Sequence, residues 1–326
     1  MNINKEILNA EKRIRKHIRE TPIDFSPYLS QLGDCRVYLK LENFQATGSF
    51  KLRGATNKLL SLRKEDLLRG IVTRSTGNHG AAVAYLCKKF CCKGIIYMPE
   101  NAAQSKIDAL RLYGIEIKLQ GRDCNESHEF AFKSAEKNNQ VFIHPYDDVK
   151  IIGGQGTIGI ELTRQIDKID TVLVPVGGGG LISGIATYLK SFNKNIEIIG
   201  CQPKNAPAMY EAIKAGRVIN IETKPSISDA TGDNIIQGNT FDICKKYVDD
   251  FILVTEEEIE KAVKLVLVKH HLLIEGAAAL SVASFIKEKE KFKHKNVVFI
   301  ISGKKISLDQ LKRIICGANY IWRSNM

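Results

Sequence analysis

A lysine with apolar neighbours lies in a short segment bounded by glycines, residues 47–54. Lys51 follows Phe50 and precedes Leu52 in this segment. Apolar surroundings withdraw an amine from water, which lowers its pKa and frees the lone pair that Schiff-base chemistry requires. Because most lysines are solvated surface residues, the segment makes Lys51 a candidate nucleophile only in combination with other motifs.

Four consecutive glycines at residues 177–180 form the second candidate site. They follow a predicted strand and precede a predicted helix, where glycine lets backbone N–H groups close around an anion. A tight turn does not require four glycines. No Lys-Ser/Thr pair follows, and Cys201-Gln202 stands where a dinucleotide site needs an acidic residue. The run therefore predicts a cradle for a single phosphate rather than for a pyrophosphate.

Polar side chains gather after two further predicted strands. Ser75, Thr76, Asn78 and His79 offer donors at the start of a predicted helix, an arrangement that suits a carboxylate. Ser302 ends another strand, where its hydroxyl could bond a ring nitrogen, although an ordinary strand-ending turn would look the same. These residues gain their significance from the two motifs above.

Short apolar runs alternate with amphipathic stretches along most of the chain, which predicts a mostly parallel sheet covered by helices on both faces. Ligands on such sheets bind beyond the carboxyl ends of the strands. A helix is predicted over residues 49–62 with Ser49 as its N-cap, and Thr255 with Glu258 forms a predicted capping box. The predicted strands are residues 37–41, 71–73, 95–98, 115–119, 171–176, 196–201, 251–254 and 297–301.

Composition bounds the class of protein. The chain has 326 residues, of which 44% are hydrophobic and 26% charged, and this length suits two lobes rather than one small core. The net charge is +12, but the lysines are scattered, which favours a solvated surface over a nucleic-acid site. Residues 1–12 are polar, and no run of about 18 apolar residues follows, so we expect a cytoplasmic protein without membrane contact.

The eight cysteines lack the paired spacing of metal ligands. A chain of this length needs no disulfide scaffold. We therefore expect buried thiols and no metal cluster.

Taken together, the segments at residues 48–54, 75–80 and 177–181 resemble the fold-type II pyridoxal 5'-phosphate (PLP) enzymes, in the branch of threonine/serine dehydratases and serine racemases. Segments 144–148, 154–157, 200–203 and 270–276 are most similar to the hydroxyectoine-utilisation type of dehydratase. The similarity runs from about residue 8 to residue 314. It implies an α/β, tryptophan-synthase-β-like fold of two parallel-sheet domains, with a small mobile domain (70–147) inserted in a large PLP-binding domain (1–69 and 148–326).

The resemblance also implies a role for each matching residue. Lys51 would carry the cofactor and move the Cα proton, and Thr76 would offer a second catalytic hydroxyl. Ser75, Thr76 and His79 would hold the substrate carboxylate. The implied cofactor-binding residues are Phe50, Lys51, Asn78, Gly177, Gly178, Gly179, Gly180, Leu181 and Ser302. The implied reaction converts a β-hydroxy amino acid to a 2-oxo acid and ammonia, in a homo-oligomer (dimer or tetramer).

Several positions depart from the family pattern. Racemases of the family have serine where Thr76 stands, so elimination is favoured over racemisation. Gln202 and Ala208 replace an acidic pair that holds a divalent cation in relatives, and neutral groups cannot replace such ligands, so no metal is expected. Ala81 replaces the glutamine of the nucleotide-activated racemases, which weakens the case for activation by ATP.

Lys304-Lys305 stands where the family has Gly-Asn or Ala-Asn, and two cations beside a cofactor ring would perturb it unless they point to solvent. Four hypotheses remain open at this point. The first is a dehydratase, the second a racemase or other lyase of the same family, and the third a catalytically silent PLP-binding homologue. The fourth, supported only by the glycine run, is a nucleotide-binding oxidoreductase.

Overall fold

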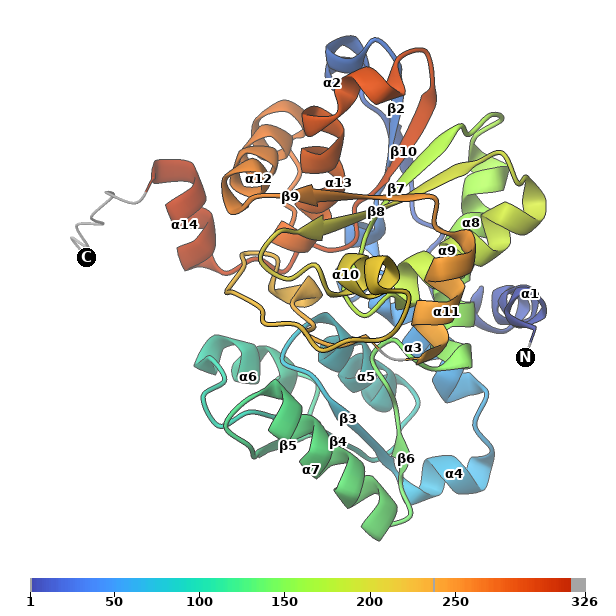
Figure 1. Ribbon diagram of the computed structural model, residues 1–326. Helices are drawn as coiled ribbons and strands as arrows, with labels where there is room; N and C mark the ends of the chain where they lie inside the picture. The colour runs from blue at the N-terminus through green and yellow to red at the C-terminus, as the bar shows by residue number, and fades with distance from the viewer. Residues whose placement is uncertain (1, 237, 318–326) are drawn as a thin grey trace.

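The computed structural model describes residues 2–236 and 238–317, which form two α/β domains with one sheet each (Figure 1). The predicted range 148–326 thus includes residue 237 and residues 318–326, which lie outside the described residues. Among the described residues, no helix is long and apolar enough to cross a membrane.

The larger domain holds a six-stranded sheet in the order β1-β2-β10-β7-β8-β9, in which only β1 runs antiparallel to its neighbour. The smaller domain holds a parallel four-stranded sheet in the order β5-β4-β3-β6. The strands are β1 (Ile23–Phe25), β2 (Arg36–Lys40), β3 (Ile71–Arg74), β4 (Gly94–Met98), β5 (Glu116–Leu119), β6 (Val141–Phe142), β7 (Thr171–Pro175), β8 (Glu197–Pro203), β9 (Asp250–Val254) and β10 (Asn296–Ile300).

Helices cover both sheets, and the strands of the smaller domain come between two segments of the larger one (Figure 1). The helices are α1 (Ile3–Ile14), α2 (Pro27–Gly33), α3 (Lys51–Leu60), α4 (Lys64–Arg69), α5 (Asn78–Lys89), α6 (Gln104–Arg111), α7 (Cys124–Lys137), α8 (Val149–Gln165), α9 (Gly180–Phe192), α10 (Ala208–Ala215), α11 (Gly238–Tyr247), α12 (Glu256–His270), α13 (Gly276–Lys287) and α14 (Leu308–Cys316). Short 3-10 helices are η1 (Glu42–Phe44), η2 (Asp229–Thr231) and η3 (Lys289–Phe292).

Both faces of the larger sheet are buried, and the alternation along β10 shows how. Val297 and Phe299 pack into the cluster that contains α12 and α13. Val298 and Ile300 pack into the cluster on the opposite face, with α8 and α9. Successive side chains of a strand point to opposite faces, so a strand that is apolar throughout needs helices on both sides.

The two domains share an apolar contact between α3 and α5. Leu52 and Leu59 of α3 lie in one buried cluster with Val83 and Leu86 of α5. Helix α5 therefore packs against α3 of the larger domain, and the first residues of these two helices approach each other.

All of the predicted strands overlap observed ones, and the capping box of Thr255 and Glu258 is confirmed. The prediction that Ser49 caps α3 is wrong, since the helix begins at Lys51 and its N-cap position is Phe50, without a side-chain cap. The backbone explains this difference. Ser49 forms a β-bridge with Gly303, and the Phe50 N–H donates to the Ser302 carbonyl at 3.1 Å. This pairing ties the start of α3 to the end of β10.

The expectation of buried thiols holds for some cysteines and not for others. Cys87, Cys201 and Cys244 are buried, whereas Cys91 and Cys316 are exposed. Cys91 has a φ of +53° in the exposed turn after α5, where its thiol lies 4.0 Å from the Lys88 carbonyl.

A fully buried cluster of charges fixes α3 to the larger domain. The Arg53 guanidinium donates to Glu42 (2.7 Å) and to Glu161 (2.6 and 2.7 Å), and Lys40 donates to Glu161 at 2.5 Å. Burial by itself raises the pKa of Glu161, but the Arg53 and Lys40 cations outweigh it and hold this pKa at about 2. The Glu161 carboxylate is therefore ionised at neutral pH.

We expect Arg53→Met to destabilise the fold by about 3–5 kcal/mol, because it removes the buried cation that bonds both Glu42 and Glu161. Chemical denaturation followed by circular dichroism measures the change. Arg63→Met serves as the control, since the Arg63 side chain is largely exposed and should leave the midpoint where it is. Equal midpoints for the two variants would contradict this role of Arg53.

Candidate active site

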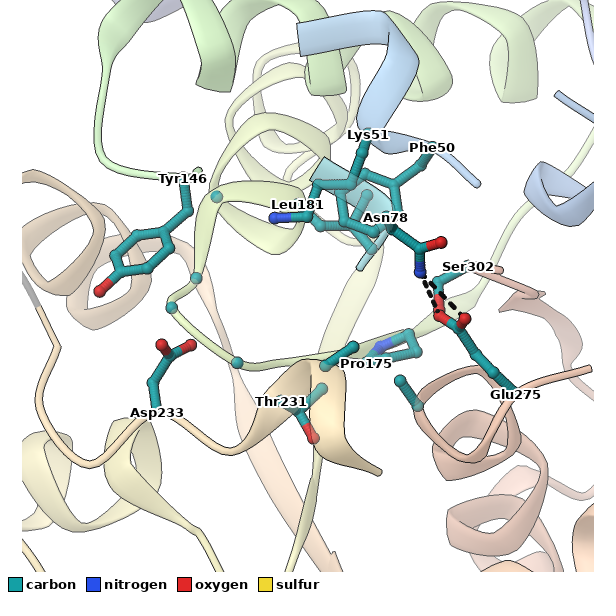
Figure 2. Close-up of a pocket in the computed structure, with 16 residues that line it drawn as sticks. Phe50, Lys51, Asn78, Tyr146, Pro175, Leu181, Thr231, Asp233, Glu275 and Ser302 are labelled. Atoms are coloured by element: carbon teal, nitrogen blue, oxygen red, sulfur yellow. Dashed lines mark hydrogen bonds between the residues drawn. The ribbon is translucent and has the colours of Figure 1, made fainter. Parts of the chain in front are cut away.

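A pocket at the junction of the two domains collects residues from separate motifs (Figure 2). It contains every residue expected to bind a cofactor, together with others that the sequence analysis did not select. The lining residues are Phe50, Lys51, Asn78, Tyr146, Pro175, Gly177, Gly178, Gly179, Gly180, Leu181, Ala230, Thr231, Asp233, Glu275, Ala277 and Ser302. Their roles toward a cofactor stay predictions, but their convergence in one place is a property of the fold.

Lys51 is the first residue of α3, and its side chain extends into the pocket (Figure 2). Its Nζ donates to the Pro145 carbonyl at 2.8 Å, a neutral acceptor. Burial lowers the pKa of Lys51 to about 8, against the opposing effect of the Asp233 carboxylate. About a tenth of this amine is therefore unprotonated at pH 7, far more than for a solvated lysine, and the neutral form is the one that acts as a nucleophile.

The glycine run is a passage between β7 and α9 with no room for side chains. A Cβ on Gly178 would lie 2.4 Å from the Tyr146 ring, and a Cβ on Gly177 would lie 2.9 Å from the Thr231 backbone. Gly179 has a φ of +87°, in the left-handed region that favours glycine, and is the N-cap of α9. Close neighbours and backbone conformation together require these glycines.

An anionic group already lies against this cradle. The buried Asp233 carboxylate accepts a hydrogen bond from the Gly178 N–H, and one of its oxygens lies 3.1 Å from where a Cβ of Gly177 would be (Figure 2). Burial raises the pKa of Asp233, although Lys51 and Arg74 oppose that shift. The Asp233 carboxylate occupies the position of an anion at the backbone of the glycine run. The N–H groups of this run are therefore placed to bind an anion and fit a phosphate group.

Asn78 and Ser302 lie on another side of the pocket, next to a carboxylate. The Asn78 Nδ2 donates to both oxygens of Glu275, at 2.8 and 2.9 Å (Figure 2). Ser302 is buried and lines the pocket beside them. An amide, a hydroxyl and a carboxylate thus surround one edge of the space that a planar ring would fill.

The residues expected to hold a substrate carboxylate lie outside the pocket lining. The Ser75 hydroxyl accepts from the Gly77 N–H at 3.2 Å, and the His79 Nε2 lies 3.2 Å from the Ile143 carbonyl. Burial and the nearby Lys51 lower the pKa of His79 to about 3, so the ring is neutral. Thr76 is half-buried. The role of Ser75, Thr76 and His79 stays a prediction.

The Lys304-Lys305 pair does not enter the pocket. Both side chains are exposed, and the Lys304 amine lies 5.8 Å from the centre of the Phe44 ring. Lys305 contributes its backbone N–H, which donates to Glu275 at 3.0 Å. Neither lysine lines the pocket, and the Lys305 charge acts only on Glu275 at its edge, so the main argument for a catalytically silent protein is weakened.

Gln202, where relatives have an acidic ligand, has a structural role. Its Nε2 donates to the Val176 carbonyl at 3.2 Å, and its Oε1 accepts from the Tyr210 N–H at 2.9 Å. The buried amide links the end of β7 to the start of α10. Both ends of this side chain are engaged with backbone groups.

The sequence analysis missed Tyr146, Asp233 and Glu275. Glu275 had a signal in the sequence, since it is a lone acidic residue between the apolar run Leu272-Leu273-Ile274 and the small apolar residues 276–279. Asp233 lies in an irregular polar segment, and nothing in its neighbours along the chain distinguishes it. Tyr146 reaches the glycines from a segment about thirty residues away in sequence.

A family model described as pyridoxal-phosphate dependent enzyme matches residues 14–303. The L-threonine ammonia-lyase of Thermotoga maritima is 39% identical over 310 residues, which cover 95% of this chain and 77% of that protein. The catabolic L-threonine dehydratase of Staphylococcus aureus is 42% identical over 314 residues, which cover 95% of this chain and 91% of that protein.

Solved structures agree with these matches. The processed form of threonine deaminase isoform 2 from Solanum lycopersicum superimposes with a TM-score of 0.93 at 32% identity, covering 98% of this chain and 94% of that one. The serine racemase of Dictyostelium discoideum gives a TM-score of 0.87 at 37% identity, covering 93% and 98%. The expected fold class is thereby confirmed, and a nucleotide-binding oxidoreductase is no longer supported.

Asp233→Asn is expected to bind pyridoxal phosphate about fivefold more tightly, because removing one charge beside the phosphate is worth on the order of 1 kcal/mol. Titration of the apoprotein, followed by absorption of the bound cofactor, measures the affinity. Asp242→Asn makes the same change in net charge at an exposed position of α11 and should bind like the parent protein. Weaker binding by Asp233→Asn would show that the carboxylate helps to hold the cofactor.

Proposed function

The chain belongs to the family of pyridoxal-phosphate dependent enzymes, and we propose that within its threonine/serine dehydratase branch this protein is an ammonia-lyase for L-threonine and L-serine. The products are a 2-oxo acid and ammonia. The observation that supports this best is the burial of the Lys51 amine beside an anion cradle of glycines. The assignment to a hydroxyectoine-utilisation subgroup stays a prediction.

Pyridoxal phosphate, when bound, supplies an electron sink for the negative charge that develops at the substrate Cα. Lys51 would hold it covalently, and the N–H groups of the four glycines and Leu181 would hold its phosphate. Phe50 would pack near the ring, Asn78 would bond the ring hydroxyl, and Ser302 would face the ring nitrogen. All of these residues line the one pocket described above.

Lys51 also handles the proton. A neutral amine released in this pocket is a base of suitable strength, because burial lowers its pKa to about 8. The hydroxyl of Ser302 is a weak acid and would not place a full positive charge on the ring nitrogen. This would limit the lifetime of negative charge at the substrate Cα and favour prompt loss of the β-hydroxyl over reprotonation.

We further propose that the substrate carboxylate binds at the turn between β3 and α5. Ser75, Thr76 and the backbone N–H groups that begin α5 are donors at a helix N-terminus, which attracts an anion. His79 is neutral, and its one ring hydrogen is directed from Nε2 to the Ile143 carbonyl, so its part in this site would be to hold the turn in place. The smaller domain, with proposed bounds 70–147, would close over the bound substrate and exclude water.

We propose a cytoplasmic homo-oligomer, a dimer or tetramer, that acts on a small amino acid. The lysines are scattered along the sequence and do not cluster in one segment, as expected for a protein that does not bind nucleic acid. The replacement of the acidic ligands by Gln202 and Ala208 supports a catalytic site that works without a divalent cation.

Lys51→Ala should abolish the visible absorption of the bound cofactor and the release of 2-oxo acid from L-threonine and L-serine. A coupled keto-acid assay on the reconstituted protein measures the activity. Lys64→Ala, at an exposed position of α4, should retain both properties. A parent protein that stays colourless with excess cofactor, or full activity in Lys51→Ala, would refute the proposed function.

The same incubations distinguish a lyase from a racemase. Thr76 keeps a hydroxyl at the position of the racemases' serine, but threonine is bulkier and stiffer about χ1. Chiral chromatography of the L-serine reaction should therefore find pyruvate in excess over D-serine. An excess of D-serine would instead assign the protein to the racemases.

The rate of cofactor uptake by the apoprotein should rise as the pH increases through about 8. Below this pKa Lys51 is protonated and cannot attack an aldehyde, whereas above it the amine is neutral. Stopped-flow absorption between pH 6 and 9.5 gives the profile. Asp233→Asn should move its midpoint to lower pH, since the Asp233 charge opposes the lowering of the Lys51 pKa. A flat profile would contradict this assignment.

A further inference from the structure

Glu275 makes a contact that its position in the fold does not require. It occupies the N-cap position of α13, yet its side chain makes no capping hydrogen bond to that helix. Its carboxylate instead accepts from the Asn78 Nδ2 at 2.8 and 2.9 Å and from the Lys305 N–H at 3.0 Å. Asn78 begins α5 of the smaller domain, so this carboxylate connects the two domains inside the pocket.

The neighbouring backbone is shaped around the carboxylate. A Cβ on Gly303 would lie 2.4 Å from the Glu275 Oε1, so a side chain at this position would displace the carboxylate. Ser302, the preceding residue, lines the pocket. Glu275 therefore lies where the residues proposed for the ring hydroxyl and the ring nitrogen meet, and Figure 2 shows Asn78, Glu275 and Ser302 grouped at that edge.

Burying a carboxylate among neutral donors costs folding free energy, because no cation compensates for its lost hydration. Such a group is therefore a candidate for a functional role. Glu275 is 5% exposed, and burial raises its pKa to about 7. The charged groups that face it are Lys51 of α3, Asp229 of η2 and Lys305 after β10, and the Asp229 charge raises the Glu275 pKa further while Lys305 opposes that effect. From α5 it faces only the uncharged Asn78 amide. The carboxylate thus changes charge within the working range of pH.

We propose that Glu275 is a positioning residue for the cofactor, which holds the Asn78 amide in place and thereby sets the ring-hydroxyl edge of the site across the domain junction. Because its Nδ2 is hydrogen-bonded to both oxygens of the carboxylate, the Asn78 amide is held in one orientation, and its Oδ1 is left without a protein partner. The inference rests on the proposed placement of the cofactor on Lys51.

Glu275→Gln tests this with an almost unchanged side-chain shape. The variant replaces charge-assisted hydrogen bonds by weaker ones, so we expect cofactor affinity to fall roughly tenfold at pH 8. Equilibrium titration of the apoprotein measures the affinity, and the absorption spectrum of the bound form should differ from that of the parent because the environment of the ring hydroxyl changes. Thermal unfolding of both apoproteins establishes that the variant folds.

Asp170→Asn is the matched control. Asp170 also accepts from an asparagine side chain, the Asn296 Nδ2 at 3.0 Å, and from a backbone N–H, that of Asn296 at 2.8 Å. It lies at the opposite ends of the parallel strands, beside the first residues of β7 and β10. The Asp170→Asn change should alter the stability of the fold but leave the cofactor affinity and the absorption spectrum unchanged.

Two further measurements separate positioning from a general structural effect. Because the parent carboxylate becomes protonated below about pH 7, the affinity difference between the parent and Glu275→Gln should narrow at pH 6. In a background that carries Asn78→Ala, the further change Glu275→Gln should have little effect, since its partner is already gone.

The outcomes are distinct. A parent protein that does not bind pyridoxal phosphate would overturn the proposed function itself. If the parent binds, equal affinities and spectra for Glu275→Gln, Asp170→Asn and the parent would overturn the inference alone. So would a loss of affinity in Glu275→Gln that is the same at pH 6 and pH 8 and additive with Asn78→Ala.

Discussion

An amine acts as a nucleophile or base near neutral pH only when it is withdrawn from water, and the site is organised around this requirement at Lys51. The residue lies at the N-terminus of α3, where the two domains meet, with a neutral carbonyl as its hydrogen-bond partner. A carboxylate in hydrogen-bonding contact would have raised the Lys51 pKa and kept the proton. The anionic groups that surround the pocket remain at a distance from which they only moderate the effect of burial.

Buried carboxylates in this protein fall into two kinds. Glu161 faces the cations Arg53 and Lys40, which hold its pKa at about 2, so it is a permanent structural charge. Glu275 faces an amide and a backbone N–H, and burial raises its pKa to about 7. A glutamate side chain is thus permanently charged at position 161, behind α3, and titratable at position 275, in the pocket. The two differ in the charge of their partners.

Much of the site could be predicted from local sequence. Gly179 has a positive φ, and its neighbouring glycines leave no room for a Cβ. The glycine run can therefore be recognised in the sequence without any knowledge of the fold. Lys51 and Ser302 likewise belong to short motifs at strand or helix ends. Ser49 shows the limit of such reasoning, because a good N-cap residue instead forms a β-bridge with Gly303, which follows β10 about 250 residues later in the chain.

Local patterns along the chain determined the strands, the glycine cradle and the candidate lysine, because each depends on residues that are neighbours in sequence. Tertiary structure alone decided that Tyr146 closes over Gly178, that the Asp233 carboxylate lies against the cradle, and that Glu275 holds Asn78. It also decided that the side chains of Lys304 and Lys305 are exposed to solvent. These contacts join residues that are distant in the chain. Their energies depend on burial and on the identity of the partner, and a local sequence pattern predicts neither.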